Sequence, residues 1–282
     1  MEIWNNKMRP KIRLLAFSLI LLISTSCDVL NTESGRSGYF NGYEVEDIYP
    51  DKLTAKLATA AGEGDTQKMD ELINQGANVN ATGNNGYSLL VWAFKMESLI
   101  GFKYLLAKGA NPDLYFGLGG DEAMISHIIS RSEYDYLEAL LEVGANPDLL
   151  TGSGPSTPLM DAVYWDDEQL KLVKLLLQVG AQIDFQTPEY GYYATKSAIT
   201  YNNFDITLYL LQQGANYQLE DFKNRSVITE MYDSRDFLDP ERYKYDQFYS
   251  GYATLIEWFE TEGVDLGFCF NKNNQDIYEL CQ

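Results

Sequence analysis

The residue types that perform catalysis are scarce in this 282-residue sequence. His127 is the only histidine, so a histidine-based metal cluster is excluded and a Ser-His-Asp site would have to use this residue. The sequence contains no Gly-x-Ser-x-Gly, Ser-x-x-Lys or His-Glu-x-x-His motif. The glycine-rich stretches at 117–121 and 151–156 lack the lysine of a phosphate-binding loop. We therefore expect no enzymatic activity, no cofactor and no metal, and we interpret His127 as a packed structural residue.

Cys27 follows a segment that is typical of a bacterial export signal. Four basic residues lie between positions 7 and 13, and ten mostly aliphatic residues follow at 14–23. Ten residues are too few to span a bilayer, which needs about 20. Small residues at 24–26 stand directly before Cys27, and this resembles the lipoprotein box, in which the cysteine is acylated. We expect residues 1–26 to be a lipoprotein signal peptide and Cys27 to carry the lipid; an ordinary signal peptide is the alternative.

A five-residue motif recurs along the rest of the chain. The sequence GANPD occurs at 109–113 and again at 144–148, and related motifs begin at Gly76, Gly180 and Gly214. The intervals between successive glycines are 33, 35, 36 and 34 residues. A fixed period in this range is the signature of a repeat protein.

The residues before each glycine predict what the repeated unit contains. Apolar pairs such as Leu105/Leu106 and Leu140/Leu141 stand three and four positions before the glycine, at helical spacing with other apolar residues. Glycine ends such a helix because it adopts the left-handed conformation at low cost. Pro112 and Pro147 then prevent the helix from resuming. Each unit is therefore predicted to end in an amphipathic helix followed by a turn.

An earlier helix is indicated within each unit. In STPLMDAV at 156–163, Thr157 is placed to cap a helix whose first turn holds Pro158, and YSLLVWAF at 87–94 occupies the matching place. These features together resemble the ankyrin repeat family, although Met160 and Val91 stand where the family has a histidine. The resemblance implies an all-α solenoid of about six helix-turn-helix units with loop fingers. We assign the units to 51–79, 80–112, 113–147, 148–183, 184–217 and 218–268.

The two ends of the repeat region, 51–268, have different compositions. Residues 27–50 lack sustained periodicity and read as a lipidated cysteine with a flexible tether, and Asp51 is placed to cap the first helix. The last unit is longer than the others, which predicts an insertion at about 231–249. Residues 269–282 are interpreted as a C-terminal cap, with QDIYELC helical in character.

Cys269 and Cys281 are the two cysteines that remain if Cys27 is acylated. In an exported protein an even remainder favours a disulfide, and this one would close the exposed end of the solenoid. By the chain-entropy relation, closing the short loop between Cys269 and Cys281 would stabilise the protein by about 3 kcal/mol. Two separate thiols are the alternative.

The charge balance bears on the class of partner. The chain has 21 basic and 41 acidic residues, a formal net charge of −20. Nucleic acid is disfavoured because its binding depends on Lys and Arg neutralising phosphates. Contact of the body with anionic lipid is disfavoured as well, so the expected membrane link is the N-terminal lipid alone. A basic or mixed-charge protein partner is favoured, although an acidic surface also serves solubility alone.

Aromatic residues in the loops are the candidate partner contacts, because Tyr is favoured at interface anchors. The candidates in two predicted finger tips are Tyr115, Phe116, Tyr190, Tyr192 and Tyr193. In the inserted segment the candidates are the aromatic residues Tyr232 and Phe237 and the interleaved acids Asp233, Asp236 and Asp239. Structural cover for the fingers and a merely decorative insertion are the alternatives.

Two functions are consistent with this sequence. Ankyrin-type lipoproteins of this kind resemble immunity proteins of secreted phospholipase effectors, which implies a periplasm-facing inhibitor of a toxin delivered by a secretion system such as type VI. The alternative is a periplasmic scaffold that supports a resident enzyme such as a catalase. The sequence leaves open the partner and whether the inner or the outer membrane holds the anchor.

Overall fold

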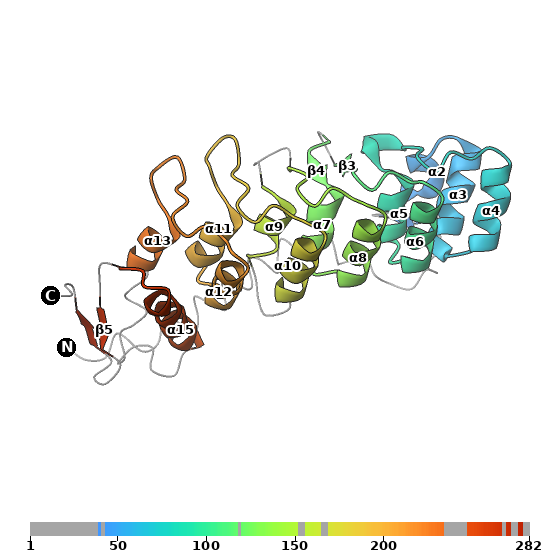
Figure 1. Cartoon of the computed structure of the whole chain (residues 1–282). Coiled ribbons are helices and arrows are strands. Elements are labelled where there is room, and N and C mark those ends of the chain that lie inside the picture. Colours follow the sequence, from blue (N-terminus) through green and yellow to red (C-terminus); the bar gives the residue numbers. More distant parts are fainter. Residues whose placement is uncertain are drawn as a thin grey trace, which may run out of the picture.

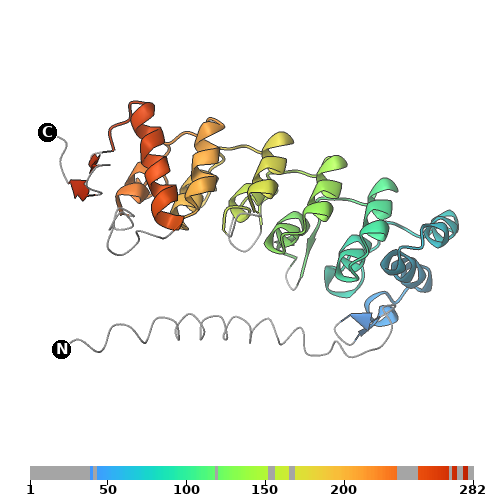
Figure 2. The same ribbon diagram turned by 90° about the horizontal axis from the view of Figure 1, so that it is seen from below.

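The protein is a single row of helix pairs (Figures 1 and 2). The computed structural model describes residues 39–40, 43–117, 120–151, 156–164, 169–233, 247–266, 269–271 and 276–278. Six successive pairs, here named repeats 1 to 6, are α3 (Lys52–Glu63) with α4 (Thr66–Asn74), α5 (Leu89–Lys95) with α6 (Leu99–Ala107), α7 (Met124–Ser130) with α8 (Tyr134–Glu142), α9 (Pro158–Asp161) with α10 (Gln169–Gln178), α11 (Ala194–Thr200) with α12 (Phe204–Gln212), and α13 (Val227–Asp233) with α15 (Gln247–Thr261).

The first helix of each pair is called the inner helix and the second the outer helix. The loop before the inner helix of a repeat is called its finger, and the fingers project on one side of the row (Figure 1). Finger 2 contains a short 3-10 helix, η1 (Asn84–Gly86), and finger 3 contains the strands β3 (Tyr115–Phe116) and β4 (Glu122–Ala123). The all-α solenoid predicted from the sequence is confirmed, with only short two-stranded hairpins added in the described residues.

The recurring Gly-Ala pair closes each outer helix in the way that its spacing predicts. Gly109 has φ 88° and Gly144 has φ 87°, both in the left-handed region. The following alanine donates its N–H back into the helix, as from Ala110 to the Leu105 carbonyl at 3.0 Å. The same alanine is buried, at 5% exposure for Ala110. Glycine thus supplies the backbone conformation and alanine a small side chain that fits under the next repeat.

The residues after the Gly-Ala pair join neighbouring fingers in a regular ladder. The Asp113 carboxylate accepts the Asn146 N–H at 2.8 Å, and the Asp148 carboxylate accepts the Gln182 N–H at 3.0 Å. Asp184 repeats the contact with the Asn216 N–H at 2.9 Å. These bonds explain why an Asn or Asp recurs at this place in the motif, since each satisfies a backbone donor of the next repeat.

The N-terminal edge of the solenoid differs from the expectation for residues 27–50. Residues 43–50 are folded rather than a tether: β2 (Tyr43–Glu44) pairs with β1 (Tyr39–Phe40), and α2 (Val45–Ile48) packs on α3. Tyr49 is 1% exposed and its hydroxyl donates to the Ser88 carbonyl at 2.9 Å. A Cβ at Gly83 would stand 2.4 Å from the Ile48 carbonyl oxygen, so glycine permits this close approach. The segment covers the edge of repeat 1, because a terminal repeat has no neighbour to bury its apolar face.

The C-terminal end carries a second correction. The stretch expected to be helical contains β6 (Asp276–Tyr278), which pairs antiparallel with β5 (Cys269–Asn271), so the helical interpretation of QDIYELC is wrong. Ile277 and Tyr278 are residues that fit a strand at least as well as a helix, and pairing with β5 decides between them. Cys281 lies outside the described residues, and the disulfide with Cys269 stays a prediction.

The predicted insertion at 231–249 overlaps two helices at its ends. Met231 is fully buried as part of α13, and residues 247–249 begin α15. Residues 234–246 lie outside the described part of the chain, and with them the candidates Asp236, Phe237 and Asp239. Within the described residues, no helix combines the length and the apolar character that crossing a membrane would require.

Candidate binding surface

Two of the predicted finger contacts are buried and belong to the core. Phe116 is 3% exposed and packs edge-on against His127 with ring centroids 5.1 Å apart. Tyr193 is fully buried, and its hydroxyl donates to the Leu219 carbonyl of finger 6. The expectation that Phe116 and Tyr193 contact a partner is therefore wrong. Each follows an exposed or half-exposed aromatic residue in extended backbone, where successive side chains point to opposite sides.

Tyr115 and Tyr232 remain at the surface. Tyr115 is 40% exposed, and its hydroxyl donates to the Leu150 carbonyl at 2.7 Å, which links finger 3 to finger 4. Tyr232 is 41% exposed on α13, next to the exposed Asp233. Their exposure keeps both residues as candidate contacts of a partner.

A group of exposed and half-exposed aromatic residues joins fingers 5 and 6. Tyr190 and Tyr192 stack with centroids 5.2 Å apart and an interplanar angle of 21°. Phe222 of finger 6 lies against Gly191, since a Cβ on this glycine would stand 2.7 Å from the Phe222 ring. Tyr190 is 45% and Phe222 64% exposed. We name Tyr190, Tyr192 and Phe222 the aromatic cap.

Phe222 is a member that sequence reasoning missed. It follows the Asp221 turn, in a segment where the only signal was one apolar residue among Glu, Asp, Lys and Asn. The Phe222 N–H donates to the Tyr190 carbonyl at 3.2 Å, so the two finger tips are also joined through the backbone. Glu189 and Glu220 are exposed beside the cap, and a hydrogen bond to Glu189 raises the pKa of the Tyr190 hydroxyl.

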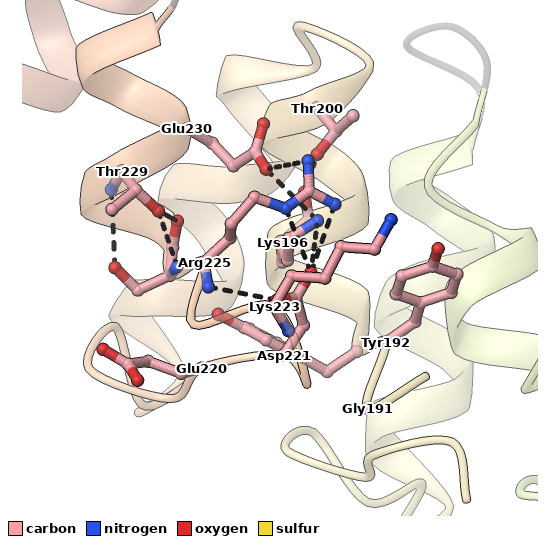
Figure 3. Close-up of polar contacts among 12 residues, drawn as sticks. Gly191, Tyr192, Lys196, Thr200, Glu220, Asp221, Lys223, Arg225, Thr229 and Glu230 are labelled. Atoms are coloured by element: carbon pink, nitrogen blue, oxygen red, sulfur yellow. Dashed lines mark hydrogen bonds and ion pairs between the residues drawn. The ribbon is translucent and has the colours of Figure 1, made fainter. Parts of the chain in front are cut away.

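Four charged residues form a cluster beside Tyr192 of the cap (Figure 3). Lys196 on α11 places its Nζ 3.4 Å from Asp221 Oδ2 and 3.2 Å from Glu230 Oε1. Arg225 Nη2 lies 3.2 Å from the same Asp221 oxygen, and its Nη1 lies 3.4 Å from Glu230 Oε1. We name these residues the ion quartet. The side chains of Lys196 and Asp221 are 6% and 0% exposed, so both charges are withdrawn from water and each depends on its partners.

Asp221 also shapes the tip of finger 6. Its Oδ1 accepts the N–H groups of Lys223 at 2.8 Å and Arg225 at 3.0 Å. Burial by itself raises the pKa of Asp221, but the two backbone N–H groups and the Lys196 ammonium outweigh it and bring the pKa below its usual value. The carboxylate is therefore ionised at neutral pH. Lys196 Nζ also lies 5.5 Å from the centroid of the Tyr192 ring, a cation–π distance that ties the quartet to the cap.

A further tyrosine pair lies on repeats 4 and 5. Tyr164, just after α9, and Tyr201, just after α11, meet with centroids 4.4 Å apart. Burial raises the pKa of Tyr164, and the neighbouring Tyr201 and, more weakly, Tyr192 add to the rise. Tyr201 is 51% exposed. The exposed aromatic surface thus extends from the cap toward the inner helices.

His127 has the structural role that the sequence predicts. Its Nδ1 meets a Glu122 carboxylate oxygen and its Nε2 lies 3.0 Å from Lys95 Nζ, while the Phe94 ring packs against it at 5.6 Å. Within the described residues, no group of three or more His, Cys, Asp or Glu side chains is placed to hold a metal ion.

Comparisons with known proteins agree with this architecture. The sequence model of the family described as Ankyrin repeats (3 copies) matches residues 124–221. The ankyrin repeat protein R664 of Acanthamoeba polyphaga mimivirus is 40% identical over 73 residues, which is 26% of this chain and 44% of that protein. The chain thus spans under half of the length of this curated relative.

Solved structures match over more of the chain. One chain of the complex between the Bd0816 predatory endopeptidase from Bdellovibrio bacteriovorus and the immunity protein Bd3460 matches with a TM-score of 0.52 at 21% identity, over 71% of this chain and 97% of that one. The ankyrin repeat domain of Bcl-3 matches with a TM-score of 0.59 at 22% identity, over 78% and 90%. An ankyrin repeat domain from Acinetobacter baumannii AYE matches with 0.54 at 18%, over 71% and 96%.

At these identities the structural matches establish the fold alone. Together with the family segment matched at 124–221, they show that the described chain has the fold of an ankyrin-repeat solenoid.

Proposed function

We propose that this protein is a non-catalytic, membrane-tethered binding module that neutralises a toxic effector enzyme, of phospholipase type, delivered by a competing bacterium. The observation that carries the binding role is the aromatic cap. Three aromatic side chains lie together on two adjoining fingers, and two of them are about half or more exposed. Large aromatic residues are the usual anchors of protein interfaces, because they bury much area with few rotatable bonds.

The shape of the molecule supports a macromolecular partner. A solenoid spreads its core in one dimension and offers an extended row of loops and inner helices rather than a closed cavity. The net charge of −20 favours a partner with a basic or mixed-charge surface, because complementary fields speed encounter and suppress wrong partners. Exposed Glu189 and Glu220 place part of that charge beside the cap.

The tether is the part of the proposal that comes from the sequence. An acyl group on Cys27 would hold the body at a bacterial membrane, where an enzyme that attacks phospholipids acts. Anchoring with several acyl chains is effectively permanent, since each buried methylene contributes about 0.8 kcal/mol. The inhibitory role is further supported by one chain of similar fold that occurs in a complex of an endopeptidase with its immunity protein.

The test is capture of partners by the full-length protein in membranes, from cells grown alone and in contact with a competitor strain. We expect a secreted enzyme of the competitor to be captured by the wild-type protein, and the Tyr190→Ala/Phe222→Ala variant to lose it. The matched control is Tyr134→Ala, which removes a tyrosine that is 36% exposed on the outer helix α8.

The protein should also protect cells that express this enzyme in the periplasm, and the cap variant should not. Capture of a resident periplasmic enzyme in both cultures, with the same dependence on the cap, would instead establish the scaffold function. Capture that does not change in the cap variant would remove the cap from the binding site.

A further inference from the structure

Lys196 occupies a position that is uncharged in the other repeats with a comparable inner helix. It is the third residue of α11, and the third residues of α5, α7, α9 and α13 are Val91, Ser126, Met160 and Thr229. Nevertheless Lys196 is only 5% exposed. Burying an ammonium group is costly, so a lysine at this place requires a compensating arrangement that the other repeats do not contain.

Both carboxylates that pair with Lys196 come from the next repeat. Asp221 belongs to finger 6, Glu230 to α13 and Arg225 to the turn between them, whereas Lys196 belongs to repeat 5. The quartet therefore crosses the boundary between repeats 5 and 6. Its charges sum to zero, and each acid meets both bases within 3.4 Å.

The boundary that the quartet crosses is the one that carries the aromatic cap. Asp221 holds the turn that presents Phe222, and Lys196 lies under the Tyr192 ring. Figure 3 shows Lys196, Asp221 and Arg225 converging beside the loop segment that holds Gly191 and Tyr192. The ion quartet thus links the two finger tips through side chains, in addition to the bond from the Phe222 N–H to the Tyr190 carbonyl.

We propose that Lys196, through the ion quartet, is a positioning residue for partner binding: it fixes fingers 5 and 6 relative to each other, so that Tyr190, Tyr192 and Phe222 form a preformed surface. This inference deepens the proposed function and rests on it for the role of the cap. A buried ion network contributes little net stability compared with apolar residues of the same volume, but it has strict geometry. A surface that is already in its bound arrangement does not have to be ordered when the partner binds.

The test compares the wild-type protein with Lys196→Met/Glu230→Gln. This pair of changes removes one positive and one negative charge and leaves Asp221 with Arg225, so that no buried charge is left without a partner. The first readout needs no partner: hydrogen exchange of the backbone N–H groups of Phe222, Lys223 and Arg225. We expect protection of these groups to fall at least tenfold, while the Asn111 N–H, held by Asn80 between fingers 2 and 3, stays unchanged.

The second readout is the affinity for the captured partner, which should fall about as far as in Phe222→Ala. Unchanged protection at finger 6 would overturn the positioning role, whatever the binding result. If hydrogen-exchange protection at finger 6 falls but the affinity for the partner is unchanged, Lys196 positions the fingers, and the proposal that this positioning serves partner binding is overturned. If the double variant unfolds, Arg225→Gln changes only the 40% exposed member of the quartet, and the same loss of protection at residues 222–225 is expected.

Discussion

In several repeats the backbone adopts the left-handed conformation at two positions: in the turn between the two helices and at the end of the outer helix. Only the position at the end of the outer helix is always glycine. Gly64 in the turn between α3 and α4 has φ 70° and stands twelve positions before the glycine at position 76. The residues at the same distance before Gly109, Gly144 and Gly214 are Glu97, Ser132 and Asn202, with φ between 56° and 60°. A side chain in this conformation is unfavourable by roughly 1–2 kcal/mol, and least so for Asn. These residues are therefore places where the sequence is not optimised for stability.

Glu97→Gly should stabilise the protein by about 1 kcal/mol, because glycine removes the strain at positive φ and its greater freedom in the unfolded chain offsets only part of that gain. Urea denaturation measures the change. Glu97→Ala is the control: it removes the same exposed carboxylate but keeps a Cβ, so it should gain little. Equal gains in both variants would show that the charge, not the backbone, is responsible.

Asp161 at the end of α9 is a second residue that is unfavourable for stability, because its carboxylate is largely withdrawn from water. Burial raises the pKa of Asp161, and the hydroxyls of Ser126 and Ser156 offset part of the rise. The folded state therefore binds a proton more tightly than the unfolded chain, whose aspartate pKa is about 3.9. The stability of the protein should consequently fall as pH rises from about 4 through the raised pKa of Asp161.

Asp161→Asn should remove this loss, because an amide of the same shape carries no charge to desolvate and can still bond to the Ser156 hydroxyl. The variant should gain stability over the wild type at pH 7 and gain much less at pH 4. Urea midpoints at both pH values give the comparison. A gain of the same size at pH 4 and pH 7 would contradict the argument, since it would not come from the titration of the carboxylate.

At the scale of the elements, a short polar side chain at the end of the recurring motif links one finger to the next. Asp148 does this twice, since its second oxygen also accepts the Gln182 side-chain amide at 3.0 Å. Asn80 makes the same contact between fingers 2 and 3 with an amide oxygen, at 2.7 Å to the Asn111 N–H. The contact therefore needs an acceptor rather than a charge.

Asp148→Ala should lower the free energy of unfolding by about 1 kcal/mol, because a backbone donor loses its partner at a largely solvated site. Asp148→Asn should stay within about 0.5 kcal/mol of the wild type, since it retains the acceptor that Asn80 uses elsewhere in the chain. Thermal and urea denaturation of both variants provide the measurement. A loss of similar size in the Asn variant would mean that the charge is required after all.

At the scale of the whole molecule, the repeats place the aromatic cap at the far end of the row from the folded N-terminal segment (Figure 1). The proposed lipid would be attached on the N-terminal side, before that segment. The body itself carries a large acid excess, which disfavours its adsorption to anionic lipid. Membrane association is therefore expected to depend on Cys27 alone.

Cys27→Ala should abolish labelling by a fatty-acid analogue, and should leave the protein either in the soluble periplasmic fraction or as an uncut precursor. Cell fractionation with metabolic labelling measures both. Cys269→Ser is the matched control, because it removes a thiol without touching the signal segment, and it should stay labelled. Labelling that persists in Cys27→Ala would contradict acylation at this residue.

What the sequence determined by itself is the repeated unit. Helix spacing, the terminal glycine and the turn residues are effects of residues within a few positions of one another, so they can be read from the order of residues alone. The number of repeats and the role of His127 as a packed residue followed from the same local patterns. The sequence did not predict the strand at 276–278 or the folded segment at 43–50. The conformational preferences of these residues are ambiguous, so contacts with another element decide their structure.

Only the tertiary structure decided which aromatic residues are free for a partner. Tyr190 and Tyr193 stand in the same tyrosine-rich loop, yet one is exposed and the other bonds to the Leu219 carbonyl inside the solenoid. Phe222 and Lys196 belong to no motif that could be recognised in the sequence, since their ion pairs and backbone contacts reach across to the neighbouring repeat. Their roles arise from contacts between repeats 5 and 6, where side-chain direction and burial, rather than composition or spacing, determine which groups meet.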